Sequence, residues 1–396
     1  MKVLMINSVC GIRSTGRICT DIATELEKQG HEVKIAYGRE NVPEQFQRCA
    51  LRIGNDLDVR LHGIKARLFD KAGFGSKRVT EKFVEQIKNY DPDIIHLHNL
   101  HGYYINIEVL FNYLKNSAKP VVWTLHDCWA FTGHCAYFDF AGCEKWEKGC
   151  FGCPQKKSYP SSILIDRSEK NYIQKKRLFT TLSNMTVVTP SEWLAGLAKK
   201  SYLGKYNIRV INNGIDTEVF KPTLGNFRQK YNIGSKKIIL GVAGVWDRRK
   251  GLEDFYKLSS ILEDSYQIVL VGLNEKQISA LPKNIIGISS TESASELAEL
   301  YSAADVFVNP TYEDNYPTVN LEAQACGTPV ITYNTGGSPE SVDFNGVVTK
   351  GNVKAIAALV KQPKKLKVLI PPPKNEQYRK YLELYEELID ESSICD

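Results

Sequence analysis

The chain has 396 residues and a formal net charge of +6, with 51 basic side chains against 45 acidic ones. That length exceeds what one ordinary hydrophobic core accommodates, so we expect two domains. The mild charge, without a long basic block, excludes a nucleic-acid partner but suits an anionic substrate or a loose contact with an anionic membrane surface. The apolar runs are too short to span a membrane and the start is too soon polar for a signal peptide, which predicts a cytoplasmic protein.

The N-terminal half opens with the pattern strand, loop, helix, strand. Residues 3–8 and 33–37 are apolar enough for buried strands, and apolar side chains recur at helical spacing between them until Gly30. This order predicts a parallel, doubly wound α/β sheet. The ligand site of such a sheet lies at the carboxyl ends of its strands.

The loop at residues 10–17 follows the first predicted strand. It lacks the glycine pattern of a dinucleotide site and the lysine of a phosphate loop. Gly16 therefore indicates either a close approach of the backbone to a ligand or a plain turn. We expect Ser14 or Thr15 to cap the helix that follows.

Two more strands are predicted at residues 94–98 and 121–125. His126 directly follows the second of them, at the ligand edge of the sheet, where it can serve a ligand or be a satisfied structural histidine. Asp91 and Asp93 precede the first strand, so they lie at the opposite edge. They imply no metal at the ligand site.

The cysteines are unevenly placed. Five of the ten fall between Cys128 and Cys153, which favours a local site over a disulfide framework. Structural zinc held by four thiolates suits the spacing, with Cys128 and His134 as substitutes. Disulfides, an iron–sulfur cluster and free thiols are the alternatives. The predicted zinc ligands are Cys135, Cys143, Cys150 and Cys153.

The most informative stretch is residues 305–333, which has the pattern strand, acidic loop, helix, strand. Pro317 suits the first position of that helix, because its missing N–H would have no partner there. The backbone N–H groups of Thr318 and Val319 then face outward at the positive end of the helix dipole. This arrangement predicts a phosphate site.

Two carboxylates flank this phosphate site. Asp314 lies just before the helix, and Glu322 lies about a turn and a half inside it. Ionised carboxylates only accept hydrogen bonds, so these two would accept hydrogen bonds from hydroxyl groups on either side of the anion. A diphosphate with a sugar at each end, as in a nucleotide sugar, fits this pattern.

A basic loop, residues 244–251, follows a predicted strand at 238–242. Lys250, together with Arg248 or Arg249, can stabilise negative charge that grows on a departing phosphate. The alternative is a solvated basic turn.

The motif around Glu322 resembles the donor site of the retaining glycosyltransferases of family four, which have the GT-B fold. Asp314 and Glu322 have the family's spacing of acidic residues, and Glu-Ala-Gln-Ala-Cys-Gly-Thr-Pro-Val follows from Glu322. The first acid is usually glutamate, so Glu313 is an alternative holder of that role. Pro317 replaces a common glycine, and Val245 stands where the family usually has an arginine.

The resemblance implies a role for each matching residue. Glu322 would hold the nucleotide ribose, Asp314 the donor sugar, and Lys250 with Arg249 the diphosphate, without a donor-site metal. The implied donor contacts are Gly16 and His126 in the first domain, and Arg249, Lys250, Asp314, Asn315, Tyr316, Thr318, Val319 and Glu322 in the second.

The resemblance also implies an organisation of two doubly wound domains. Residues 1–206 would form an acceptor-side domain with a cysteine-rich excursion at 128–153, which is similar to a subset of the family. Residues 207–372 would bind the nucleotide sugar. Residues 373–396 would form an amphipathic helix that returns to the first domain, although such a helix also suits a membrane surface or a partner.

The expected function is transfer of a sugar, with retention, from a nucleotide-diphosphate sugar to a glycan or lipid-linked acceptor. Family members of this kind build surface polysaccharides, and peripheral membrane contact would accompany that role. An epimerase or phosphorylase on the same fold, or a non-catalytic protein stapled by zinc, are the alternatives. The sugar, the base and the acceptor are not encoded in any motif.

Overall fold

The computed structural model describes residues 1–394, and the chain forms two compact units. Unit 1 comprises Met1–Asn212 together with the chain from Asn375 onward, and unit 2 comprises Asn213–Lys374. The first boundary falls later than the predicted 206, because the strand at Asn207–Val210 pairs with the sheet of unit 1.

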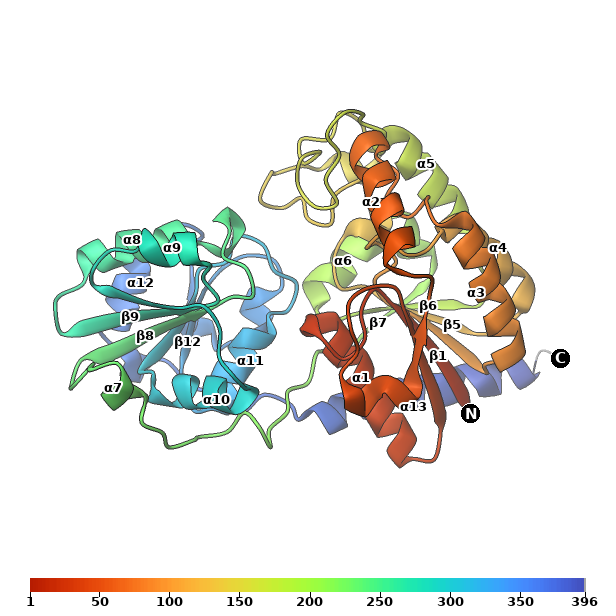
Figure 1. The fold of residues 1–396 in the computed structure, drawn as a ribbon. Coiled ribbons are helices and arrows are strands. Elements are labelled where there is room, and N and C mark those ends of the chain that lie inside the picture. The colour runs from red at the N-terminus through yellow and green to blue at the C-terminus, as the bar shows by residue number, and fades with distance from the viewer. Residues whose placement is uncertain (395–396) are drawn as a thin grey trace. The chain divides into compact units, whose positions relative to one another are not determined.

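Unit 1 is built on a seven-stranded parallel sheet with helices on both faces (Figure 1). Its strand order is β3-β2-β1-β4-β5-β6-β7, so the order reverses between β1 and β4. A short strand, β3, forms one edge of the sheet and was not predicted from the sequence. The strands are β1 (Lys2–Asn7), β2 (Glu32–Tyr37), β3 (Ala50–Arg52), β4 (Ile94–Leu97), β5 (Val121–Thr124), β6 (Met185–Thr189) and β7 (Asn207–Val210). The helices are α1 (Arg13–Lys28), α2 (Asp56–Phe69), α3 (Lys77–Tyr90), α4 (Ile107–Ser117), α5 (Ser168–Phe179), α6 (Glu192–Lys200) and α13 (Lys374–Ile394).

Alternate residues of the central strands pack in two separate hydrophobic cores of unit 1, one on each face of the sheet. Leu4 and Ile6 of β1 pack with α3, α4, α5 and α6, whereas Val3 and Met5 pack with α1 and α13. This follows from the period of two in a strand, which sends successive side chains to opposite faces. Burial on both faces explains why these strands are continuous apolar runs in the sequence.

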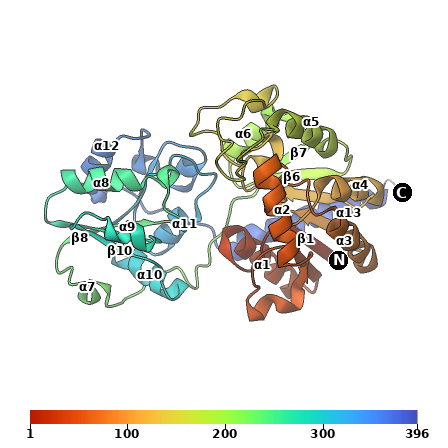
Figure 2. The same ribbon diagram turned by 45° about the horizontal axis from the view of Figure 1, so that its top comes forward.

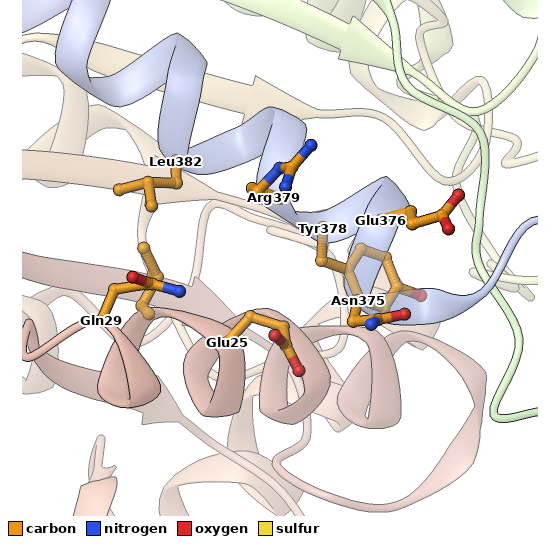
Figure 3. Close-up of a pocket in the computed structure, with 8 residues that line it drawn as sticks. Glu25, Gln29, Asn375, Glu376, Tyr378, Arg379 and Leu382 are labelled. Atoms are coloured by element: carbon orange, nitrogen blue, oxygen red, sulfur yellow. The ribbon is translucent and has the colours of Figure 1, made fainter. Parts of the chain in front are cut away.

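The last helix, α13, packs on the sheet of unit 1 through its tyrosines. The Tyr385 hydroxyl lies 2.6 Å from His96 Nδ1, and the Tyr381 hydroxyl lies 3.1 Å from Thr124 Oγ1. All four side chains are buried. A surface pocket remains between α1 and α13, where Glu25 and Gln29 face Tyr378 and Arg379 (Figure 3).

Unit 2 is built on a six-stranded parallel sheet in the order β10-β9-β8-β11-β12-β13. The order reverses between β8 and β11, which makes this pair of strands the topological switch point of the sheet. The strands are β8 (Lys237–Val242), β9 (Tyr266–Val271), β10 (Ile285–Ile288), β11 (Val306–Asn309), β12 (Val330–Tyr333) and β13 (Val347–Val348). The helices are α7 (Phe227–Lys230), α8 (Leu252–Ile261), α9 (Glu275–Ser279), α10 (Ala294–Ala303), α11 (Thr318–Ala325) and α12 (Val353–Val360).

Helices also cover both faces of the sheet in unit 2 (Figures 1 and 2). Ile239 packs with α8 and α12, while its neighbours Ile238 and Leu240 pack with α7, α10 and α11. The prediction of two doubly wound parallel sheets is therefore confirmed. Between residues 1 and 394, no helix is long and apolar enough to cross a membrane.

Candidate active site

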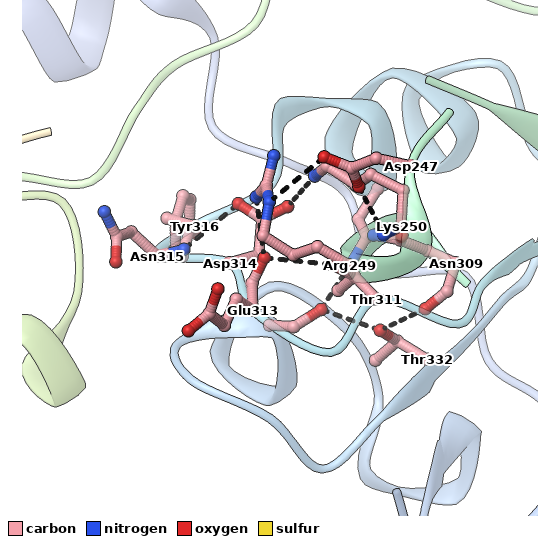
Figure 4. Close-up of polar contacts among 12 residues, drawn as sticks. Asp247, Arg249, Lys250, Asn309, Thr311, Glu313, Asp314, Asn315, Tyr316 and Thr332 are labelled. Atoms are coloured by element: carbon pink, nitrogen blue, oxygen red, sulfur yellow. Dashed lines mark hydrogen bonds and ion pairs between the residues drawn. The ribbon is translucent and has the colours of Figure 1, made fainter. Parts of the chain in front are cut away.

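The basic loop and the acidic loop meet at the switch point of unit 2. They follow β8 and β11, which are adjacent and parallel, so both loops leave the same edge of the sheet. Lys250 Nζ lies 2.5 Å from Asp314 Oδ2, and the two side chains are only 21% and 17% exposed (Figure 4). The residues predicted to hold the diphosphate and the donor sugar are therefore joined to each other by an ion pair.

Neighbouring residues fix both sides of this ion pair. Asp247 Oδ1 accepts a hydrogen bond of 3.0 Å from the Lys250 N–H and caps the turn. Arg249 Nη1 donates to the Glu313 carbonyl oxygen at 3.1 Å, so Arg249 reaches the acidic loop (Figure 4). The Asp314 carboxylate faces Lys250, whereas the Glu313 side chain is buried. Arg249 and Asp314 thus take part in the contacts that join the two loops, and which member of each ambiguous pair contacts a donor stays a prediction.

Two glycines let the loops approach one another, and the sequence analysis gave neither a role. Gly336 has φ +57, and a Cβ there would lie 2.0 Å from the carbonyl oxygen of Asp314. Gly251 has φ +75, and a Cβ there would lie 2.2 Å from the carbonyl oxygen of Pro310. The Gly337 N–H also donates to the Asp314 carbonyl oxygen at 3.1 Å. Glycine is required at both positions, since no Cβ fits.

Helix α11 begins one residue later than predicted. Pro317 has ψ 115 and is the N-cap, so Thr318 is the first helical residue, followed by Val319. The prediction that Pro317 occupies the first helical position is therefore wrong, because its ψ angle is extended and not helical. The Asn320 N–H bonds the Pro317 carbonyl oxygen at 3.1 Å. The N–H groups of Thr318 and Val319 precede it at the end where a helix presents unbonded donors.

Glu322 is buried in α11 and bonded to a side chain from α10. The Tyr301 hydroxyl donates to Glu322 Oε2 at 2.9 Å, and Glu322 is 4% exposed. Tyr301 was not among the site residues predicted from the sequence. The tyrosine fixes the orientation of the carboxylate that was predicted to hold the ribose.

Asn315 and Tyr316 are both buried beside the acidic loop. The Asn315 N–H donates to Asp314 Oδ1 at 3.0 Å. The Tyr316 ring packs in an apolar core of unit 2, and this burial raises the pKa of its hydroxyl to about 12. The role of Tyr316 in holding a donor sugar stays a prediction.

A buried amide network, absent from the sequence analysis, anchors the start of α11. The Asn320 side chain is fully buried; its Oδ1 accepts from Asn309 Nδ2 at 2.9 Å, and its Nδ2 donates to Ser341 Oγ at 2.9 Å. Thr332 Oγ1 donates to the Asn309 carbonyl oxygen at 2.9 Å (Figure 4). An asparagine inside a helix gives no such signal in a sequence, because its partners come from other elements.

In unit 1, His126 lies at the carboxyl edge of the sheet, as its position after β5 predicts. Its Nε2 lies 2.9 Å from His98 Nδ1. Burial lowers the pKa of His126 to about 4 and that of His98 well below its ordinary value, so both rings are neutral near pH 7. Whether His126 contacts a donor stays a prediction.

Gly16 lies within α1 and packs against its own loop. A Cβ there would lie 3.0 Å from Val9 Cγ2 and 3.2 Å from the Gly11 nitrogen. The helix starts at Arg13 with Ile12 as its N-cap, so the expectation that Ser14 or Thr15 caps it is wrong: both fall inside the first turn. The close approach of the backbone is real, but it is to this chain itself; contact with a diphosphate stays a prediction.

The cysteines of the excursion gather at one pocket within unit 1. Cys135, Cys143, Cys150 and Cys153 all line it, and all four are free thiols. In residues 1–394, no three histidine, cysteine, aspartate or glutamate side chains are arranged to hold a metal ion as they stand. Zinc binding stays a prediction at this point.

Two descriptions of glycosyltransferase families match the two halves of the chain. The family description "Glycosyltransferase Family 4" matches residues 15–219, and "Glycosyl transferases group 1" matches residues 225–383. The chain belongs to glycosyltransferase family 4.

Similar proteins agree with this class. The chain is 27% identical over 360 residues to the "Putative colanic acid biosynthesis glycosyl transferase WcaC" of Escherichia coli K12, covering 87% of this chain and 86% of that protein. It is 28% identical over 182 residues to the N,N'-diacetylbacillosaminyl-diphospho-undecaprenol alpha-1,3-N-acetylgalactosaminyltransferase of Campylobacter jejuni, covering 41% of this chain and 48% of that enzyme.

Solved structures share the fold at low sequence identity. A glycosyltransferase from Rickettsia africae aligns with a TM-score of 0.68 and 17% identity, covering 98% of both chains. HepE from Anabaena in complex with UDP-glucose aligns with a TM-score of 0.64 and 15% identity, covering 100% of both chains. The fold is therefore GT-B, as predicted.

Proposed function

We propose that this glycosyltransferase moves a sugar from a nucleotide-diphosphate sugar to a glycan or lipid-linked acceptor, with retention at the anomeric carbon. The observation that carries the proposal is the convergence of Lys250, Arg249 and Asp314 at the switch point of unit 2, near the N-terminus of α11. Two cations and a helix N-terminus at one edge suit a diphosphate. The Anabaena neighbour, solved with UDP-glucose, supports a donor of this class.

The chemistry requires charge stabilisation at the departing phosphate. The bond between the anomeric carbon and the phosphate oxygen breaks, and the nucleoside diphosphate leaves with the electron pair. Lys250 and Arg249 would stabilise the negative charge on that phosphate, assisted by the N–H groups of Thr318 and Val319. No donor-site metal is required, because these groups already supply the positive charge.

The carboxylates would hold the two sugars of the donor. When the diphosphate forms an ion pair with the Lys250 ammonium, Asp314 would be released from its own ion pair with Lys250. Asp314 would then accept a hydrogen bond from a hydroxyl of the transferred sugar. Glu322, fixed by Tyr301, would accept the ribose hydroxyls. The new bond between the anomeric carbon and the acceptor oxygen then forms on the face from which the diphosphate left, and the acceptor hydroxyl gives its proton to the departing phosphate oxygen.

A lipid-linked acceptor would bring the protein to a membrane. In unit 1, α2 lies beside the loop that precedes α5 (Figure 1). Exposed apolar side chains of these two segments form what is hereafter called the α2 surface. The Ile163 N–H donates to the Arg67 carbonyl oxygen at 2.6 Å, which places the two segments side by side. The apolar members of the α2 surface are Leu57, Leu61, Ile64, Ile163 and Leu164, each at least half exposed. Its exposed basic members are Arg60, Lys65 and Arg67.

We infer that the α2 surface contacts an anionic lipid bilayer. Apolar side chains beside lysine and arginine match the acyl boundary and headgroups of such a bilayer. The name of the Campylobacter relative, which includes diphospho-undecaprenol, supports a lipid-linked acceptor.

The proposal is tested by release of nucleotide from a panel of UDP-, GDP- and ADP-sugars. We expect slow hydrolysis of one donor by the wild type, and a loss of about 100-fold or more in Lys250→Ala, since the group stabilises charge at the transition state. Glu322→Gln should chiefly weaken donor binding. Lys276→Ala, which removes an exposed lysine from α9, is the matched control and should keep full activity.

Other outcomes would reject parts of the proposal. Release that persists in Lys250→Ala means that the phosphate site lies elsewhere. Conversion of the donor sugar without release of nucleotide indicates an epimerase. Binding without any turnover, even with lipid-linked acceptors present, indicates the non-catalytic alternative.

A further inference from the structure

The segment between β5 and α5 is long and contains no regular helix or strand. Residues 125–167 include only two short 3-10 turns. The rings of Phe131, Phe138 and Trp146 pack together there, with centroids 5.0 to 6.4 Å apart. The residues before 139 belong largely to the main core of unit 1, but from residue 139 to residue 167 Trp146 is the one buried member of that core. Long irregular loops with so few core contacts are uncommon in compact domains, and a cross-link or a metal ion can hold such a loop in one conformation.

The thiols of this segment surround one space beside the aromatic cluster. Cys135 is buried and Cys143, Cys150 and Cys153 are half-buried, and all four line the same pocket. We propose that this pocket binds a structural zinc ion through these four thiolates. A closed set of four sulfur ligands in tetrahedral arrangement is a standard structural zinc site. The inference concerns unit 1 alone and does not depend on the donor site in unit 2.

The sulfurs must close in on the ion. As placed, the described side chains do not form a ligating group of three or more. Rotation about χ1 moves a cysteine sulfur between staggered positions without moving the backbone. Zinc binding then supplies free energy to a segment that has little core of its own.

The backbone of the pocket provides a hydrogen bond and a turn that suit the cysteine sulfurs. The Gly133 N–H donates to Cys150 Sγ at 3.1 Å. Gly152, with φ +52, provides the left-handed turn that brings Cys150 and Cys153 to the same side. A hydrogen bond from a backbone N–H stabilises a thiolate more than a thiol, because it favours the charged form.

A buried cation compensates the charge of the proposed site. One zinc ion with four thiolates has a net negative charge, which is costly to bury alone. Lys175 is buried, donates to the carbonyl oxygens of Trp129 at 2.8 Å and Thr132 at 3.1 Å, and interacts electrostatically with Cys150 and Cys135 as well as with the carboxylates of Asp70 and Asp127. Both of these hydrogen bonds go to backbone carbonyl oxygens, so the thiolates of the proposed site would add to the negative charge around the Lys175 ammonium.

His134 is a second buried group that lines the same pocket. Its side chain is 0% exposed, Nδ1 lies 2.6 Å from Asp70 Oδ1, and Nε2 has no hydrogen-bond partner. A carboxylate behind a histidine ring is the usual arrangement for fixing a histidine beside a metal. We assign His134 as a positioning residue that faces the thiolates, with Asp70 holding its ring.

The test is the metal content of the full chain, purified without a chelator. We expect about one zinc ion per chain, released when the thiols are titrated with an organomercurial. Cys150→Ser should lose the zinc, whereas Cys326→Ser, a buried cysteine of unit 2, should retain it. His134→Gln should retain one zinc ion but bind it about 10- to 100-fold more weakly, as is typical of a lost outer-shell partner.

Measurements on the wild-type protein alone can contradict the proposed zinc site, so the test does not depend on whether the variants fold. Ten reactive thiols and no zinc would contradict it. Two or more missing thiols that return on reduction would show disulfides in its place, and bound iron would show a cluster. Loss of zinc in His134→Gln, with retention in Cys143→Ser, would overturn the assignment of four sulfur ligands.

Discussion

At the scale of single residues, the candidate site depends on partners that lie far apart in the sequence. Lys250 and Asp314 are separated by 64 residues, and Tyr301 and Glu322 by 21. The motif around Glu322 predicted Asp314 and Glu322 as the carboxylates that hold the donor. It could not predict that Asp314 pairs with Lys250, because this contact depends on β8 and β11 being neighbours in the sheet.

The Tyr301 hydroxyl offers a sensitive probe of the Glu322 carboxylate. Tyr301→Phe keeps the ring in the core but removes the donor to Glu322 Oε2. Loss of the partner of a buried acceptor lowers the free energy of unfolding by about 1–3 kcal/mol. We therefore expect a lower melting temperature for the variant. If Glu322 holds the ribose, nucleotide affinity, measured by calorimetry, should also fall several-fold.

A matched variant separates the two effects. Tyr206→Phe removes a buried hydroxyl that donates to the Phe179 carbonyl oxygen at 2.7 Å in unit 1. It should lower the melting temperature to a similar extent and leave nucleotide affinity unchanged. Equal nucleotide affinity in both variants would argue against Glu322 as the ribose contact.

At the scale of elements, the sequence predicted most strands to within one or two residues, since strands buried on both faces are continuous apolar runs. It did not predict β3, which has only three half-buried residues, or the strands β10 and β13. It also misplaced the start of α11 and the cap of α1, where loop geometry overrides residue preference. The close contact at Gly336 was beyond its reach, because the contact joins two loops.

Gly336 should be indispensable for the position of the acidic loop. Gly336→Ala would place a Cβ 2.0 Å from the Asp314 carbonyl oxygen, so the loop must move away from Lys250. We expect at least a tenfold loss of donor turnover, measured by nucleotide release. Gly234→Ala is the control, because Gly234 has φ +61 but nothing within 4 Å of its Cβ position.

The control isolates backbone strain from steric conflict. Both substitutions force alanine into the left-handed region, at a cost of about 1–2 kcal/mol. Only the change at Gly336 displaces Asp314. Equal activity of the two variants would show that the position of this loop does not matter for turnover.

At the scale of the whole molecule, the sequence predicted two doubly wound sheets and a final helix that packs on the first of them. The tyrosines of α13 bury against His96 and Thr124 in unit 1, although the helix follows unit 2 in the chain. Helical spacing of apolar residues indicated the buried face. This spacing could not predict which of the two sheets the buried face packs on. The resemblance to the family supplied the expectation that it is the first sheet.

Unlike α13, α2 has apolar residues that no other element within residues 1–394 covers. Leu61 and Ile64 are each 50% exposed, beside Ile163 and Leu164 at 62% and 63%. We expect the double variant Leu61→Glu, Ile64→Glu to lose binding to vesicles of anionic phospholipid in a sedimentation assay, by tenfold or more. Two apolar contacts are removed and two negative charges then face the anionic headgroups, where each nearby basic residue contributes about 1 kcal/mol of attraction.

A single exposed leucine on the other unit provides the control. Leu224→Glu changes a fully exposed residue of unit 2 to the same charged residue, so it should leave vesicle binding intact. Vesicles of zwitterionic lipid alone should bind the wild type weakly, since the basic residues then lack their partner. Binding that resists the double variant, or that is equally strong on zwitterionic vesicles, would mean that the α2 surface is not the membrane contact, and a protein partner would become the better explanation for it.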